Sequence, residues 1–116
     1  MGDGGFAHSW AELETLVRMQ IPITIIVLNN GILGFQREAE TVKFGKYTTA
    51  CHFAEVDHVK IAQACGCEAV RVSHTRELEA QMKKVRGRNV PLLIEVVTDP
   101  EAHPAISLFA QMDSAA

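Results

Sequence analysis

Three stretches of the chain are dominated by apolar, largely β-branched residues, and each has the length of a strand. Ile23–Leu28 and Leu92–Val97 are almost continuous apolar runs, which is the pattern of parallel strands covered on both faces. Ala69–Val72 has the same character over a shorter length. Asn29-Asn30-Gly31 follows the first run with turn chemistry, so we expect that strand to end there.

Between these runs the apolar residues change to helical spacing. Leu13 and Val17 recur at a helical interval. Ser9 and Glu12 have the spacing of a capping box, which predicts that this helix begins at Trp10. Helices are also predicted near Leu33–Ala39, over Asp57–Ala64 and from Thr75 to just before Gly87, with a loop through Lys43–His52.

Helices that alternate with parallel strands predict an α/β fold, an open and mostly parallel sheet with helices on both faces. We expect residues 1–116 to form one domain, because domains usually hold about 100–150 residues. The chain opens on a glycine-rich turn of the kind that follows a strand, so we expect a partial domain lacking its first strands. From Asp99 on we expect a terminal extension with one helical turn near Ile106–Ala110.

Composition and charge exclude several classes of protein. The chain is 47% hydrophobic and 22% charged, which is typical of a globular domain rather than a disordered one. Its longest apolar run is far shorter than the about 20 residues that cross a bilayer, and its start has no secretory signal. The net charge of −3 comes with no basic stripe, so we expect no nucleic-acid partner. The basic cluster Lys83, Lys84, Arg86 and Arg88 is attributed to a helix end.

Three cysteines, Cys51, Cys65 and Cys67, are an odd number for a disulfide-bonded chain. They indicate free thiols and a reducing, cytoplasmic compartment. The one-residue gap of Cys65-Gly66-Cys67 is not the spacing of common zinc sites.

Other residues with functional potential are given structural interpretations. His52, Asp57 and His58 match no common set of metal ligands, so solvated or capping roles are predicted. Trp10 and Phe35 are predicted to pack in the protein. A contact of Phe35 and Gln36 with a bound substrate is kept as the alternative.

Candidate ligand-binding residues occur in two segments, which the predicted fold would bring near each other. Gly2-Asp3-Gly4-Gly5 precedes the first helix, and glycines at unpaired helical N–H groups form a seat for phosphate. Asp3 would repel a phosphate unless a divalent cation such as Mg²⁺ lay between them. Asn29-Asn30, at the carboxyl end of the next strand, would supply an amide oxygen to that cation.

A dinucleotide-binding fingerprint is the rival interpretation of the same turn. Gly2-x-Gly4-x-x-Ala7 has its spacing, and the fingerprint requires an acidic residue at the end of the second strand to bind the ribose. This chain has Asn29-Asn30 at the equivalent place, and Asp3 would lie beside a pyrophosphate without a metal. The rival is therefore disfavoured.

Gly2-Asp3-Gly4, followed after 24 residues by Asn29-Asn30, resembles the thiamine-diphosphate motif of the acetolactate synthase and 2-oxo-acid decarboxylase superfamily. The surrounding sequence also fits, from Gly5-Phe6 to the Glu12-Leu13-x-Thr15 helix and the last strand at Pro91–Val96. The resemblance implies the C-terminal diphosphate-binding domain of such an enzyme, a flavodoxin-like, doubly wound α/β domain.

The resemblance also implies roles for individual residues. Asp3, the Asn30 side chain and the Ile32 backbone carbonyl would bind Mg²⁺. Backbone amides of Gly4, Gly5 and Phe6 would line the diphosphate of thiamine diphosphate. The complete set of implied cofactor-binding positions is Gly2, Asp3, Gly4, Gly5, Phe6, Asn29, Asn30, Gly31 and Ile32, with Asn29 orienting the turn.

The function implied is that of the cofactor-binding part of an acetolactate synthase-like enzyme, which decarboxylates a 2-oxo acid such as pyruvate and forms a carbon–carbon bond. In the family, the glutamate that activates the cofactor comes from a pyrimidine-binding domain of the same or a neighbouring subunit. We therefore assign no catalytic residue here and expect an inactive isolated chain and a homo-oligomeric parent. A non-catalytic diphosphate-binding module and a benzoylformate- or indolepyruvate-type decarboxylase are the alternatives.

Overall fold

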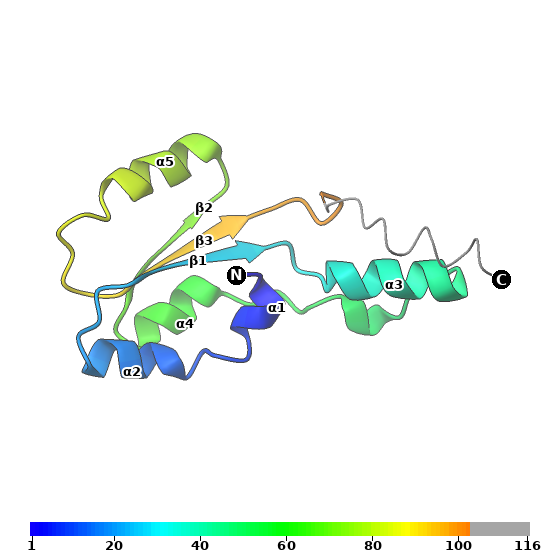
Figure 1. Ribbon diagram of the computed structural model, residues 1–116, viewed down its shortest axis with the longest axis horizontal. Coiled ribbons are helices and arrows are strands. Elements are labelled where there is room, and N and C mark those ends of the chain that lie inside the picture. The colour runs from blue at the N-terminus through cyan, green and yellow to red at the C-terminus, as the bar shows by residue number, and fades with distance from the viewer. Residues whose placement is uncertain (103–116) are drawn as a thin grey trace. The chain divides into compact units, whose positions relative to one another are not determined.

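The computed structural model describes residues 1–102, which hold three strands and six helical segments (Figure 1). In chain order these are α1 (Asp3–Phe6), α2 (Glu12–Arg18), β1 (Thr24–Asn29), α3 (Gly34–Phe44), the 3-10 turn η1 (Thr49–Cys51), α4 (His58–Ala64), β2 (Glu68–Val72), α5 (Thr75–Lys83) and β3 (Leu92–Val97). The helical turn expected near Ile106–Ala110 lies outside the described residues.

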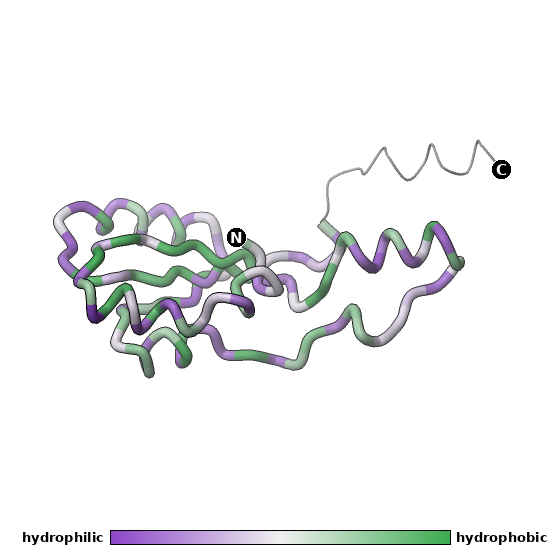
Figure 2. Tube along the Cα trace, turned by 60° about the horizontal axis from the view of Figure 1, so that its bottom comes forward, coloured by the Kyte–Doolittle hydropathy of each residue, from purple (hydrophilic) through white to green (hydrophobic). Residues whose placement is uncertain are grey.

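The three strands form one parallel sheet in the order β1-β3-β2, which confirms the predicted α/β class. Ile94 at the centre of β3 is in register with Ile26 of β1 and Val70 of β2. Figure 2 shows long stretches of hydrophobic residues in the part of the chain that holds the sheet, and Glu68 and Arg71 interrupt this character in β2. The central strand β3 is buried over Leu92–Glu95, as the apolar run predicted.

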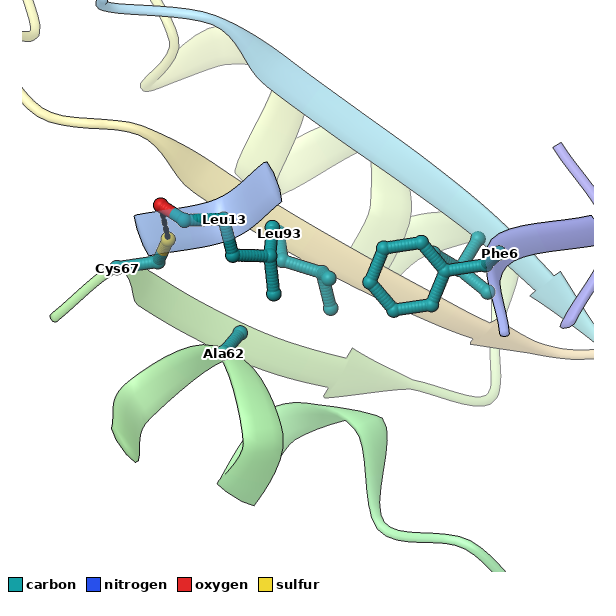
Figure 3. Packing of buried hydrophobic residues seen from close by; sticks show 6 residues of the cluster. Phe6, Leu13, Ala62, Cys67 and Leu93 are labelled. Atoms are coloured by element: carbon teal, nitrogen blue, oxygen red, sulfur yellow. Dashed lines mark hydrogen bonds between the residues drawn. The ribbon is translucent and has the colours of Figure 1, made fainter. Parts of the chain in front are cut away.

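Helices cover both faces of this sheet, because strand side chains alternate between the faces. On one face α1, α2 and α4 pack over a cluster of buried residues, part of which Figure 3 shows in close-up. On the other face α5 packs Leu78 against a second cluster. The first cluster contains Phe6, Leu13, Val27, Ala62, Cys67 and Leu93, and the second contains Val72, Leu92 and Ile94.

The start of the chain differs from the prediction. Asp3–Phe6 forms a one-turn helix of its own, and α2 begins at Glu12 rather than at Trp10. The expected capping box is absent, because the Ser9 hydroxyl donates to the Phe6 carbonyl at 3.2 Å and α2 has no side-chain cap.

Three other predictions from the pattern were wrong in extent. The helix expected near Leu33–Ala39 continues to Phe44, and the loop expected after it contains the η1 turn. β1 is not covered on both faces along its length, since the side chain of Leu28 is 48% exposed.

The chain divides into two compact units. The first contains Met1–Asn30 and Val56–Thr98, and so holds the whole sheet. The second contains Gly31–Glu55 and, of the described residues, 99–102. Within it Arg37, on α3, is buried and its Nη1 donates to Glu101 Oε1 at 2.6 Å. Among residues 1–102, no helix combines the length and apolar character that spanning a membrane requires.

Candidate functional site

The first residues of the chain run alongside the carboxyl end of β1. The Leu28 N–H donates to the Met1 carbonyl at 2.8 Å, and Gly2 forms a parallel bridge with Leu28. Asp3 and Asn29 each come one residue after this pair. They therefore begin from the same end of β1, where Figure 1 shows α1 beside the tip of the strand.

The turn that carries Asp3 is held closed by its own backbone. The Phe6 N–H donates to the Gly2 carbonyl at 2.9 Å, and the Ala7 N–H donates to the Asp3 carbonyl at 3.0 Å. The Phe6 ring is 2% exposed and fixes the turn to the core, and Asp3 is itself buried. Because the Phe6 amide already has an acceptor, Gly4 and Gly5 are the better candidates for amides that meet an anion.

Space beside this turn is open. A Cβ built on Gly2 or on Gly5 would meet no atom within 4 Å. Gly4 and Gly5 lie in the first turn of α1, where N–H groups have no partner within the helix. The turn thus combines room with backbone donors, which is what a bound diphosphate needs.

Asn29 and Asn30 close β1 at the same end. Asn29 is the last residue of the strand, and its carbonyl accepts from the Thr98 N–H at 2.8 Å. Asn30 is half-buried and follows directly. Gly31 then adopts a φ of 68°, a left-handed conformation that favours glycine, so the chain turns away from the strand here.

The remaining predicted site residues belong to the second unit. Ile32 is buried and forms an antiparallel bridge with His52. In the same unit the Phe35 ring is 65% exposed, so the prediction that it packs in the protein is wrong for the described residues. Gln36 donates from Nε2 to Glu40 Oε1 at 2.9 Å.

Sequence reasoning missed a buried polar cluster next to Asn29. Glu95, in the middle of β3, has no exposed surface. Its Oε1 accepts from Asn29 Nδ2 at 2.6 Å and from His58 Nδ1 at 2.9 Å, and its Oε2 accepts from Arg71 Nε at 2.7 Å. Burial raises the pKa of Glu95, but the hydrogen bonds from His58, Arg71 and Asn29 outweigh it and hold the pKa below its ordinary value.

The prediction for His58 was wrong, because its ring is 4% exposed rather than solvated. Its centroid lies 5.7 Å from that of Phe6 and 6.0 Å from that of Trp10. Trp10 does pack in the protein, as predicted, and its Nε1 has no hydrogen-bond partner within residues 1–102. Asp57 caps α4, as the capping interpretation expected, by accepting from the Lys60 N–H at 3.0 Å.

The donor set at the end of β1 suits a hard cation. A carboxylate from Asp3 and an amide oxygen from Asn30 are ligands that Mg²⁺ accepts. A cation between a carboxylate and a diphosphate also removes the repulsion between them. The residues present therefore fit a magnesium diphosphate.

Comparisons with known proteins concern the organic cofactor rather than the metal. Residues 1–96 match the family described as the thiamine pyrophosphate enzyme C-terminal TPP binding domain. The chain is 34% identical over 98 residues to acetolactate synthase of Bacillus subtilis, covering 84% of this chain and 17% of that protein. It is 32% identical over 111 residues to acetolactate synthase 2, chloroplastic, of Nicotiana tabacum, covering 88% of this chain and 17% of that protein.

A solved structure is similar as well. The thiamine diphosphate-dependent 4-hydroxybenzoylformate decarboxylase of Rhodococcus jostii RHA1 superposes with a TM-score of 0.81 at 27% identity, covering 85% of this chain and 19% of that one. The chain spans less than a fifth of the length of each of these relatives. The family match, the parallel sheet and the shared relatives lead to one conclusion: this chain belongs to the family of C-terminal thiamine diphosphate-binding domains of thiamine diphosphate enzymes.

Proposed function

We propose that this chain is the C-terminal cofactor-binding part of an acetolactate synthase-like enzyme. That enzyme would use thiamine diphosphate and Mg²⁺ to decarboxylate a 2-oxo acid such as pyruvate and to form a carbon–carbon bond. The observation that carries the proposal is the pairing of Gly2 with Leu28, from which Asp3 and Asn29-Asn30 both begin at the same end of β1. The acetolactate synthases among the relatives support the reaction.

In this proposal each residue binds or orients, and none reacts. Asp3 and the Asn30 side chain hold Mg²⁺, with the Ile32 carbonyl as a third ligand. The Gly4 and Gly5 amides meet the diphosphate, and the open space at Gly2 and Gly5 admits it. When bound, thiamine diphosphate would supply a nucleophilic carbon and a thiazolium ring that can accept the electrons left by decarboxylation.

The same proposal requires a partner. The glutamate that activates the cofactor is expected from a pyrimidine-binding domain of the same or a neighbouring subunit, so we propose a homo-oligomeric enzyme and an inactive isolated chain. The three free cysteines fit a reducing, cytoplasmic compartment.

A decarboxylase that releases its product without forming a carbon–carbon bond is the second candidate. The similarity to 4-hydroxybenzoylformate decarboxylase favours it, because that enzyme shares the fold of this chain at a TM-score of 0.81. Assays of the whole enzyme with pyruvate and with an aromatic 2-oxo acid separate the two candidates. Formation of a coupled hydroxy-keto acid supports the first, and aldehyde release alone supports the second.

Binding to the 116-residue chain tests the cofactor assignment. We expect isothermal titration calorimetry with thiamine diphosphate to give heat only when Mg²⁺ is present. Asp3→Asn removes the charged ligand with little change in shape, so the affinity should fall by more than about tenfold. Glu79→Gln makes the same change on the exposed surface of α5, where Glu79 pairs with Lys83, and should leave the affinity unchanged.

Two results would contradict the assignment. Equal affinities for the wild type and Asp3→Asn would remove Asp3 from the metal site. Absence of any Mg²⁺-dependent heat with the wild type would favour the non-catalytic module instead.

A further inference from the structure

The carboxylate of Glu95 is the only fully buried charge that β3 carries among the described residues, and it lies on the face covered by α1, α2 and α4. In the strand register Glu95 is level with Val27 of β1 and Arg71 of β2. Asn29 stands two residues beyond Val27 on the same face, because side chains alternate along a strand. Glu95 and Asn29, the last residue of β1, therefore project from the same face of the sheet on neighbouring strands.

An ionised carboxylate accepts hydrogen bonds and donates none, so neighbouring side chains must turn their donor atoms toward it. Glu95 Oε1 lies 2.6 Å from Asn29 Nδ2, which requires the amide nitrogen, and not the oxygen, to face the sheet. The same oxygen lies 2.9 Å from His58 Nδ1, which must therefore carry a proton. Asn29 Nδ2 and His58 Nδ1 are 3.5 Å apart and, as two donors, share the acceptor rather than bond to each other.

The second oxygen of Glu95 is engaged from the other side. Arg71 Nε donates to Oε2 at 2.7 Å, and Arg71 Nη2 lies 3.4 Å from Asp57 Oδ1 at the start of α4. The Glu95 carboxylate therefore links β1, β2 and β3 to one another and to the start of α4. Hydrogen bonds from several directions fix the position of the Glu95 carboxylate. The fixed carboxylate can therefore hold the Asn29 side chain in one rotamer.

We propose that Glu95 is a positioning residue that fixes the Asn29 side chain and, through it, the Asn29–Asn30 turn. The bearing of this role on Mg²⁺ rests on the proposed function, in which Asn30 is a ligand. Asn29 itself would not contact the metal, and its task would be to keep Asn30 in place. Glu95 would then act on cofactor affinity without touching the cofactor.

The charge of Glu95, and not only its shape, is needed for this task. Glutamine in its place would keep one oxygen but turn an amide NH₂ group toward donors, either those of Asn29 and His58 or that of Arg71. Glu95→Gln should therefore free the Asn29 side chain from its single orientation. Glu68→Gln is the matched control, because Glu68 lies at the opposite end of β2, where Arg88 pairs with it.

Nuclear magnetic resonance of the 116-residue chain tests the positioning directly. We expect Glu95→Gln to shift the side-chain amide signals of Asn29 and the backbone amide signals of Asn30 and Gly31. Asn29→Ala should shift the same two backbone signals, and the double variant should add nothing further at these two signals, because both changes remove the contact between Asn29 and Glu95. Glu68→Gln should leave these signals in place. Asn29→Ala keeps the test open if Glu95→Gln does not fold.

Titration with Mg²⁺ and thiamine diphosphate adds the functional reading. Glu95→Gln should weaken the affinity by about 10-fold or more in the wild-type background and have no effect in the Asn29→Ala background. A purely structural role would lower the affinity equally in both. Unchanged Asn30 signals in Glu95→Gln, or an equal loss in both backgrounds, would overturn the proposal. A wild-type chain that does not bind would overturn the proposed function, while the amide signals would still decide the positioning role.

Discussion

Asp57 shows how one side chain can serve a helix and a charge network together. Its Oδ1 accepts from the Lys60 N–H and lies 3.4 Å from Arg71 Nη2. The hydrogen bond from the Lys60 N–H is the largest influence on the carboxyl group, and it outweighs burial to hold the pKa of Asp57 below its ordinary value. The charged form of Asp57 therefore stabilises the folded state more than the neutral form does.

This difference predicts a pH-dependent effect of mutation. Asp57→Ala should lower the free energy of unfolding by about 1 kcal/mol at pH 7, the usual effect of losing an N-cap. Asp57→Asn keeps a capping oxygen and loses only the charge. Because the pKa is lowered on folding, the contribution of the charge is present above about pH 4 and is lost as the pH falls below that value. Urea unfolding at pH 7 and pH 3 should show the wild type converging on Asp57→Asn in acid. A gap that does not change with pH would contradict this.

At the scale of elements, the turn from α4 into β2 depends on Gly66. Its φ is 93°, in the region that favours glycine, and the Gly66 N–H donates to the Gln63 carbonyl at 3.0 Å. A Cβ at this position would come within 3.2 Å of Val17 Cγ1 on α2. The turn therefore combines a conformational and a steric requirement, because it lies directly against Val17 of α2.

Gly87 has the conformational requirement without the steric one. It has a φ of 80°, but a Cβ there would meet nothing within 4 Å. Gly87→Ala should therefore lower the free energy of unfolding by about 1 kcal/mol, the conformational cost alone. Gly66→Ala should cost more, because Val17 must also move, and Val17→Ala should recover part of the excess. Thermal unfolding of Gly87→Ala, Gly66→Ala, Val17→Ala and the double variant of Gly66→Ala with Val17→Ala measures this. Equal losses for the two glycine variants would show that α2 gives way at Gly66.

At the scale of the whole molecule, the confirmed predictions concern elements whose sequence pattern follows directly from their burial. Parallel strands buried on both faces are mostly apolar, so β3 could be found from its residues despite Glu95. The helix α3 could not be bounded in this way, because it buries only Arg37 and has no apolar stripe to follow. Ser9 has the spacing of a helix cap, but its hydroxyl donates a hydrogen bond to the Phe6 carbonyl of the additional turn α1.

In the candidate site, only the residues within or next to the sequence motif could be predicted. Asp3, Asn30 and Ile32 as metal ligands stay predictions, whereas the position of Asp3 at the end of β1 follows from the Gly2–Leu28 bridge. Glu95 carried one signal, an acid inside an apolar strand. Its partners Asn29, His58 and Arg71 are 66, 37 and 24 residues away, so only the folded chain brings them together.

The distribution of burial across the chain predicts where the backbone opens last. β3 is paired on both sides and buried over Leu92–Glu95, so its amides exchange only when the sheet itself comes apart. α3 buries one residue of its 11 and should open by local fluctuations at a lower free energy. Hydrogen exchange followed by mass spectrometry should therefore find the slowest peptide over β3, intermediate rates over β1 and β2, and fast exchange over α3. Glu95→Gln should speed exchange in β3 more than in α3, since the charge network joins the strands and α3 has no part in it. Equal protection of α3 and β3 would contradict this order of opening.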